Sequence, residues 1–219
     1  MATKKTAVVN ESMETKQRAV TIPAPKFEMA QFPIKGNAPY VQNAFPEKAR
    51  QMMRDKQAAG SQAKKGKARD AKDFELCYEQ AQHKSTAGWN GIPSSAFRKA
   101  MISACRLVDF KMTLAKLSLF VVADGYDGLD GTPLTRIVGE PHYVEHAVRN
   151  ETGVADIRPR PMWNDWSAVV TLRWDAGQFS MTDVANLMMR VGIQVGIGEG
   201  RPDSKNSAGM GWGTFDLVK

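Results

Sequence analysis

The feature that most constrains the fold is a glycine-rich segment near the end of the chain, "VGIGEGRPDSKNSAGMGWGTFDL", residues 195–217. Six glycines fall within 18 residues there, in two triplets separated by a short spacer that contains basic residues. A dinucleotide site or a P-loop needs its glycines after a strand and before a helix, because the helix N-terminus holds the phosphates. The predicted order here is a helix, then the glycines, then a strand, which excludes both nucleotide-binding arrangements.

The helix that precedes the glycines carries clear boundary signals. Ser180 and Asp183 have the spacing of a capping box, in which each side chain accepts from a backbone N–H of the other residue. Gly196 follows where the end of a helix favours positive φ. Between them, apolar residues at helical spacing predict a buried stripe: Val184, Leu187, Met188, Val191 and Val195.

The remaining pattern predicts an α+β fold. We expect strands over 26–36, 116–123 and 167–175, two longer and more irregular strands between 134 and 163, and a helix over 93–110. The strand over 167–175 alternates well, with Ala168, Val170, Leu172 and Trp174 on one face. Mixed strands and helices in this order favour an antiparallel sheet with helices on one face.

Charge is concentrated in one part of the chain. The net charge is +7, and the stretch from Glu47 to Lys72 holds nine basic residues against three acidic ones, which accounts for +6 of it. Such clustering is typical of proteins that bind polyanions. A solvated basic loop with no partner is the alternative.

Composition indicates where in the cell the protein is expected. Residues 1–25 are polar and are expected to form a disordered tail, with neither a signal peptide nor a membrane span. Two cysteines, Cys77 and Cys105, are too few for a disulfide framework or a four-cysteine zinc site. These observations favour a cytoplasmic protein, the host cytoplasm if the chain is phage-encoded.

Two segments resemble the RAMP superfamily, the repeat-associated proteins of CRISPR effector complexes. One is the strand, capped helix, glycine-rich loop and last strand of residues 166–218, and the other is "GIPSSAFRKAMISACR" within 89–110. The chain is also similar to phage and prophage proteins of similar length. The region between the two segments matches the superfamily only in general layout.

The resemblance implies a modified RRM-like (ferredoxin-like) domain over 26–219, with a basic finger-like insert over 46–85 and a thumb-like hairpin over 133–162. It also implies copies that polymerise along a single-stranded nucleic acid. Residues that match the early motif are Ser94, Ser95, Arg98 and Lys99. Those that match the late loop are Gly196, Gly198, Gly200, Arg201, Gly209, Gly211 and Gly213. Glu199 and the spacer "PDSKNSA" depart from the pattern, and this puts a direct contact between the loop and phosphate in question.

Basic residues and two tryptophans next to them are the candidate nucleic-acid contacts, because cations bind phosphates and indole rings stack on unpaired bases. We expect Trp89 and Trp163 to be the stacking residues. The basic candidates are Lys48, Arg50, Arg54, Lys64, Lys65, Lys67, Arg98, Lys99, Arg136, Arg158, Arg160, Arg201 and Lys205.

We therefore expect a non-enzymatic protein that coats or anneals single-stranded DNA in phage replication or recombination, with RNA as a close alternative. A second hypothesis is a metal-independent endoribonuclease, with His83, His142 or His146 as a general base. A third is a structural protein whose basic insert contacts an acidic partner. No cofactor or metal is expected, because "DGYDGLDG" has threonine where a calcium loop needs glutamate.

Overall fold

The computed structural model describes residues 22–45, 50–52, 54–55, 73–149, 155–204 and 209–218. The strands of its main sheet are β1 (Phe27–Gly36), β3 (Gly91–Pro93), β4 (Leu119–Val122), β5 (Gly125–Tyr126), β6 (Pro133–Val138), β9 (Ser167–Asp175) and β10 (Phe215–Leu217). All pairings are antiparallel, in the order β10-β1-β9-β6-β3, with β4 also on β9 and β5 on β6. The fold is α+β, as the sequence predicts.

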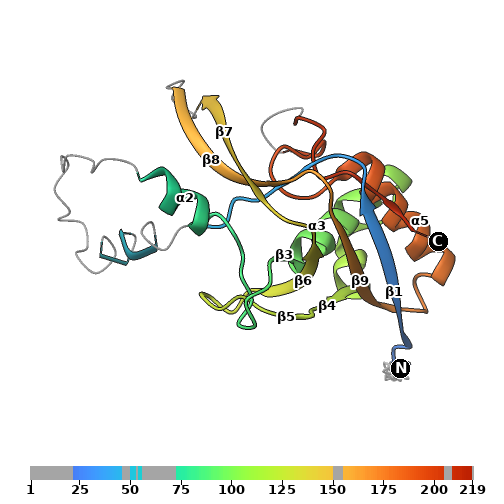
Figure 1. Cartoon of the computed structure of the whole chain (residues 1–219). Coiled ribbons are helices and arrows are strands. Elements are labelled where there is room, and N and C mark those ends of the chain that lie inside the picture. The colour runs from blue at the N-terminus through green and yellow to red at the C-terminus, as the bar shows by residue number, and fades with distance from the viewer. Residues whose placement is uncertain are drawn as a thin grey trace, which may run out of the picture.

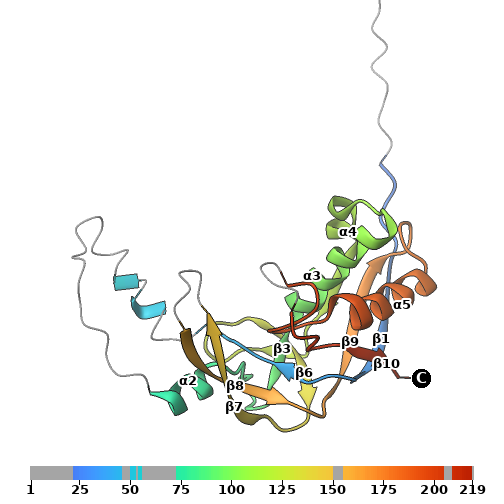
Figure 2. The ribbon, with the colours of Figure 1, turned by 90° about the horizontal axis from the view of Figure 1, so that it is seen from above.

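The helices that matter most for the core are α3 and α5. The named helical elements are α2 (Phe74–Gln80), α3 (Ser94–Ala104), α4 (Met112–Ser118) and α5 (Met181–Arg190), with single turns η2 (Cys105–Val108) and η3 (Val191–Val195); the described residues 50–52 and 54–55 are helical as well. Figure 2 shows α3 and α5 on the same side of the main sheet. Phe97 and Met101 of α3 share one buried cluster with Val184 and Met188 of α5.

The alternation along β1 and β9 explains which face of the sheet the helices cover. On β9 the predicted residues, Ala168, Val170, Leu172 and Trp174, are all buried, which confirms the prediction. Their neighbours on β1, Phe32 and Ile34, are buried with them. Met29 and Val169, on the opposite face, are exposed, so the main sheet has one covered and one open face.

Helix α5 begins where the sequence predicts, and the turn η3 that continues it ends where the sequence predicts. Ser180 and Asp183 form both hydrogen bonds of the capping box, and Gly196, with φ of 68°, follows η3. The five predicted stripe residues are all buried. Burial of each such side chain contributes about 1.5–3 kcal/mol, so packing holds this helix against the sheet.

A second sheet stands apart from the first. It consists of β2 (Tyr40–Val41), β8 (Ala155–Trp163) and β7 (His142–Arg149), and Figure 1 shows β7 and β8 projecting away from the main sheet. Helix α2 packs against β8. The hairpin expected over 133–162 is therefore shorter, because residues 133–138 are β6 and pair with β3 and β9.

Two further boundaries differ from the prediction. The strand expected over 116–123 begins only at Leu119, because residues 112–118 form α4. The helix expected over 93–110 ends at Ala104 and continues as η2 to Val108, where Asp109 adopts a left-handed φ of 53°. Most of the expected basic insert and tail lies outside the described residues; of the insert, residues 50–52, 54–55 and 73–85 are described.

None of the helices in the described part of the chain is long and apolar enough to cross a membrane. Cys77 and Cys105 are both free thiols, and Cys105 is buried in the core.

The glycine-rich segment packs closer to its neighbours than any side chain would allow. A Cβ on Gly213 would lie 1.8 Å from the carbonyl oxygen of Ile197, and one on Gly198 would lie 2.6 Å from both the Tyr40 ring and the Val41 carbonyl oxygen. Both glycines have positive φ. The glycines thus let the segment lie directly against β2 and against itself.

Gly213 and Gly211 provide a matched test of this packing. Both have positive φ, but a Cβ on Gly211 would meet nothing within 4 Å. We expect Gly211→Ala to cost about 1 kcal/mol from backbone strain alone. We expect Gly213→Ala to cost at least about 3 kcal/mol because a steric clash is added to the strain. Urea unfolding of the two variants checks this, and equal losses would contradict it.

Candidate nucleic-acid groove

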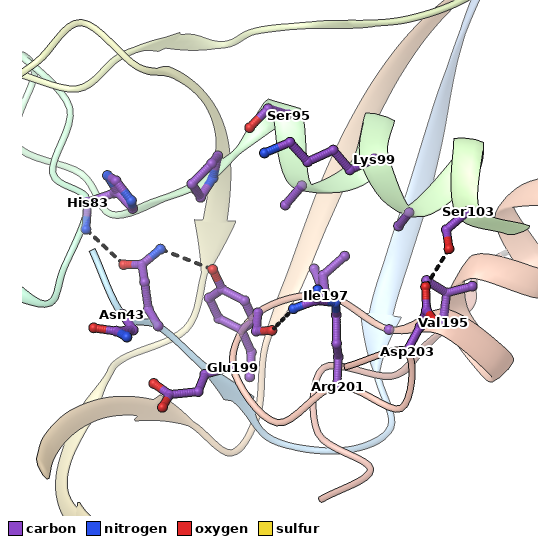
Figure 3. Close-up of a pocket in the computed structure, with 17 residues that line it drawn as sticks. Asn43, His83, Ser95, Lys99, Ser103, Val195, Ile197, Glu199, Arg201 and Asp203 are labelled. Atoms are coloured by element: carbon purple, nitrogen blue, oxygen red, sulfur yellow. Dashed lines mark hydrogen bonds between the residues drawn. The ribbon is translucent and has the colours of Figure 1, made fainter. Parts of the chain in front are cut away.

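A cleft of about 640 Å³ opens between α3, the end of β2 and the glycine-rich segment. We call it the groove, and we call the described residues 195–204 and 209–213 the glycine loop. Figure 3 shows side chains from all three elements directed toward the same space. The groove therefore joins the two segments that carry the resemblance.

The wall of the groove that α3 forms consists of polar and small side chains. Ser95, Lys99 and Ser103 recur four residues apart and line it. The other residues of α3 that line it are the small residues Ala96 and Ala100. The spacing places all five on one side of the helix. Lys99 is exposed and, among the described residues, has no ion-pair partner.

The other two residues of the early motif serve the core. Ser94 is buried, and its hydroxyl lies 3.1 Å from that of Thr135 on β6. Arg98 donates from Nε to the Leu119 carbonyl oxygen at 2.8 Å and stacks over the Phe120 ring. Arg98 therefore joins α3 to β4, and its contact with nucleic acid stays a prediction.

The floor of the groove is held rigid by Gln42. Its side-chain amide donates to the Tyr40 hydroxyl at 3.0 Å and to the Gly91 carbonyl oxygen at 2.8 Å, and its oxygen accepts from the His83 backbone N–H at 2.8 Å. Burial raises the pKa of Tyr40 well above its usual range, so the hydroxyl stays protonated. Gln42 thus ties β2 to residues 83 and 91 through three hydrogen bonds.

The glycine loop forms the opposite wall and is latched to α3. Arg106 Nη2 donates to both carboxylate oxygens of Asp203, at 2.9 Å each, and the Ser103 hydroxyl donates to the same carboxylate. The hydrogen bond from Ser103, together with Arg106, lowers the pKa of Asp203. Arg201, next to this latch, donates to the Gly198 carbonyl oxygen at 3.0 Å.

The glycine loop also contacts the projecting hairpin. Arg160 of β8 is only 8% exposed and donates to Glu199 at 2.5 Å. The His146 ring on β7 lies 4.8 Å from that of Trp212, between centroids. These two contacts bring β7 and β8 against the side of the groove.

The pairing of charges leaves the groove cationic. Two acidic residues line it. Glu199 is neutralised by Arg160 and Asp203 by Arg106, and neither arginine lines the cleft itself. Lys99 and Arg201 remain on facing walls and form no direct ion pair among the described residues, although Arg201 lies close enough to Asp203 to help lower its pKa. An anion is the natural complement of two such cations beside serine hydroxyls.

The other predicted basic residues are scattered. Arg50 pairs with Asp130, Arg54 is exposed, and Arg158 pairs with Asp156 at 3.0 Å. Arg160, almost fully buried, reaches the groove only through Glu199. The predicted lysines outside the described residues are Lys48, Lys64, Lys65, Lys67 and Lys205.

The two predicted stacking residues have different outcomes. Trp163 is fully buried, 5.5 Å from the Tyr40 ring between centroids, so the prediction that it stacks on bases is wrong. It fails because β8 pairs with β2 and turns this indole into the core. Trp89 is half-buried and lines a separate small cavity together with Arg136.

Several groove residues were not identified as contacts from the sequence. Ser103 could have been found, because it continues the four-residue spacing of Ser95 and Lys99. Tyr40, Gln42 and Asn43 carry no local signal, since only the pairing of β2 with β8 brings them to the cleft.

The acidic loop between β4 and β6 uses its carboxylates internally. Asp124, Asp127 and Asp130 accept from the backbone N–H groups of Arg136, Leu129 and Thr132 respectively. Among the residues that the structure describes, no group of three or more His, Cys, Asp or Glu side chains is placed to hold a metal ion.

A scan against protein-family models finds no match to this chain, and a comparison with curated proteins finds no significant match.

The latch at Asp203 predicts a specific pH dependence. Because the folded-state pKa is lowered, the carboxylate stabilises the fold above the ordinary carboxyl pKa of about 3.9, and this stabilisation is lost as the pH falls through the folded value. We expect Asp203→Asn to lose up to about 1 kcal/mol at pH 7, because the pair is partly exposed. The gap to the wild type should narrow toward pH 3.

Urea unfolding at several pH values measures that gap. Asp165→Asn is the control, because Asp165 forms an exposed ion pair with Lys35 and should cost little at any pH. A gap at Asp203 that stays constant or widens in acid would contradict the latch.

Proposed function

We propose that this chain is a non-enzymatic, single-stranded nucleic-acid-binding protein of RAMP-like fold. In this proposal it assembles side by side along the strand and coats or anneals single-stranded DNA during phage replication or recombination, in the host cytoplasm. RNA is the close alternative ligand. The observation that carries the proposal is the groove, where Lys99 and Arg201 lie on facing walls and form no direct ion pair among the described residues.

The connectivity of the main sheet supports the ferredoxin-like part of the proposal. Along the chain, β1, α3, β4, β9, α5 and β10 follow one another in a βαββαβ order, apart from inserted elements. In the sheet these strands are ordered β10-β1-β9-β4. A ferredoxin-like core has this arrangement, and here the hairpin β7–β8 is an insertion between β4 and β9.

The dimensions and chemistry of the groove favour a single strand. A cleft of about 640 Å³ accommodates one sugar–phosphate backbone with a few unpaired bases rather than a stacked duplex. Side-chain cations, hydroxyls and amides along it match the phosphate and sugar groups of such a strand. The exposed Asn43 and Ser95 also line the cleft and offer an amide and a hydroxyl to groups beside the backbone.

Assembly along the strand is supported by apolar side chains on the surface. Leu107, Val108, Met112 and Leu117, on η2 and α4, are between 37% and 74% exposed. Exposed apolar clusters often mark contacts between proteins. This surface lies beside α3 but not within the groove, so a neighbouring copy could cover it while the strand stays bound.

Removal of the groove cations tests the binding proposal. We expect Lys99→Ala and Arg201→Ala each to weaken binding of a labelled single-stranded oligonucleotide about five- to tenfold and to reduce the salt slope by about one. Lys111→Ala is the matched control, since this exposed lysine precedes α4 away from the groove. Fluorescence anisotropy between about 50 and 200 mM salt measures both effects.

Equal effects at Lys99 and Lys111 would contradict the groove, and salt-independent binding would contradict the phosphate contacts. Sedimentation with oligonucleotides of increasing length, DNA and RNA in parallel, then gives the number of copies bound. One copy on every length would remove the assembly part of the proposal.

A second candidate function rests on His83. Its Nδ1 lies 2.6 Å from a carboxylate oxygen of the buried Asp127, which leaves Nε2 for another partner, and His83 is one of the residues that line the groove. A histidine oriented by a carboxylate is a common general base, here for attack of an RNA 2′-hydroxyl on its own phosphate. The same bond also joins residues 83–85 to the acidic loop, as do the Ser85–Asp127 bridge and the Gly128–Lys84 backbone bond. The binding function is therefore preferred.

Cleavage assays decide whether His83 is a general base or has a structural role only. If the protein is only a binder, labelled RNA stays intact on a denaturing gel with the wild type. If it is a metal-independent nuclease, RNA is cut in the presence of EDTA, DNA is not, and His83→Ala abolishes the cutting. His142→Ala, on the exposed side of β7, is the control and should behave like the wild type.

A further inference from the structure

A second, smaller cavity lies on the open face of the main sheet, across the sheet from the groove. It measures about 290 Å³ and is lined by Trp89, Asp124, Arg136, Val138 and Val169. Arg136 and Val138 alternate along β6 with Thr135 and Ile137, which are buried on the helix side. The size is at the lower limit for ligand cavities, about 300 Å³, and suits a single planar ring system.

The Trp89 ring is held in place before any ligand binds. Its backbone N–H donates to the Ser85 hydroxyl at 3.2 Å, and its carbonyl oxygen accepts from the Ser85 N–H at 2.9 Å. The indole packs against two glycines, so that a Cβ on Gly125 would lie 2.7 Å from its Cζ2 and one on Gly91 would lie 3.0 Å from its Cζ3. A fixed indole beside a cavity is a ready stacking surface for a base.

Asp124 makes the cavity selective for hydrogen-bond donors. One of its oxygens accepts from the Arg136 backbone N–H at 2.8 Å, which orients the carboxylate. A carboxylate accepts hydrogen bonds and repels both phosphate and carbonyl oxygens. Arg136, exposed at the same cavity, supplies the opposite charge for a phosphate outside it.

We infer that this cavity binds one unpaired guanine of the strand, stacked on Trp89 with its Watson–Crick edge toward Asp124. The inference rests on the proposed function. Guanine presents two adjacent donors, N1–H and the N2 amino group, to a carboxylate. Uracil and thymine place carbonyl oxygens on both sides of their single N–H, and adenine and cytosine place a ring acceptor beside their amino group, so each of these sets an acceptor against the carboxylate.

The test compares oligothymidine strands that carry one central guanine, adenine or cytosine, by competition in fluorescence anisotropy. We expect the guanine strand to bind the wild type about tenfold more tightly than the all-thymidine strand. Asp124→Asn should abolish this ratio and leave binding of the all-thymidine strand nearly unchanged. Asp165→Asn, an exposed carboxylate outside the cavity, should keep the ratio.

Two variants of the stacking residue separate binding from folding. Trp89→Ala should remove the guanine preference, and Trp89→Phe, which retains a smaller ring, should keep part of it at an unchanged melting temperature. If strands bind with no base preference, or if Asp124→Asn keeps the preference, the inference is overturned while the proposed function stands.

If no strand binds at all, the proposed function fails, and free GMP then tests the cavity alone. Quenching of tryptophan fluorescence by GMP that is absent in Trp89→Phe, and weaker for UMP, would support a guanine nucleotide site independent of a strand. Absence of such quenching would overturn the cavity as well.

Discussion

The close approach of the glycine loop to β2 is the contact on which the groove depends. Gly198 lies over the ring of Tyr40, and Gly213 lies against the Ile197 carbonyl, at distances that leave no room for a Cβ. Because the glycine loop lies so close to β2, it faces α3 across a cleft instead of merging with this helix into one surface. Any side chain at these two positions would raise the loop and separate Lys99 from Arg201.

Ion pairs then determine the sign of the charge in that cleft. Glu199 and Asp203 stand in the same loop as Arg201, and unpaired they would cancel its charge. Arg160 and Arg106 neutralise them from the hairpin and from η2, and the same contacts hold the loop in place. Glu199 thus has a structural role, since it links the hairpin to the glycine loop.

Local signals predict the secondary structure of the core better than they predict the site. The capping box at Ser180 and the alternation along β9 are encoded within a few residues and are confirmed. By contrast, whether Arg98 or Lys99 faces a ligand depends on β4, and the burial of Trp163 depends on its pairing with Tyr40. Such contacts join residues far apart in sequence, where periodicity carries no information.

The most direct test of the account is hydrogen–deuterium exchange of the full chain with and without a single-stranded oligonucleotide. We expect the strand to slow exchange in the glycine loop, in the segment after β2 and at the start of α3, with little change in α5. Saturated binding that leaves all three groove elements unprotected would contradict the central claim that the groove holds the strand.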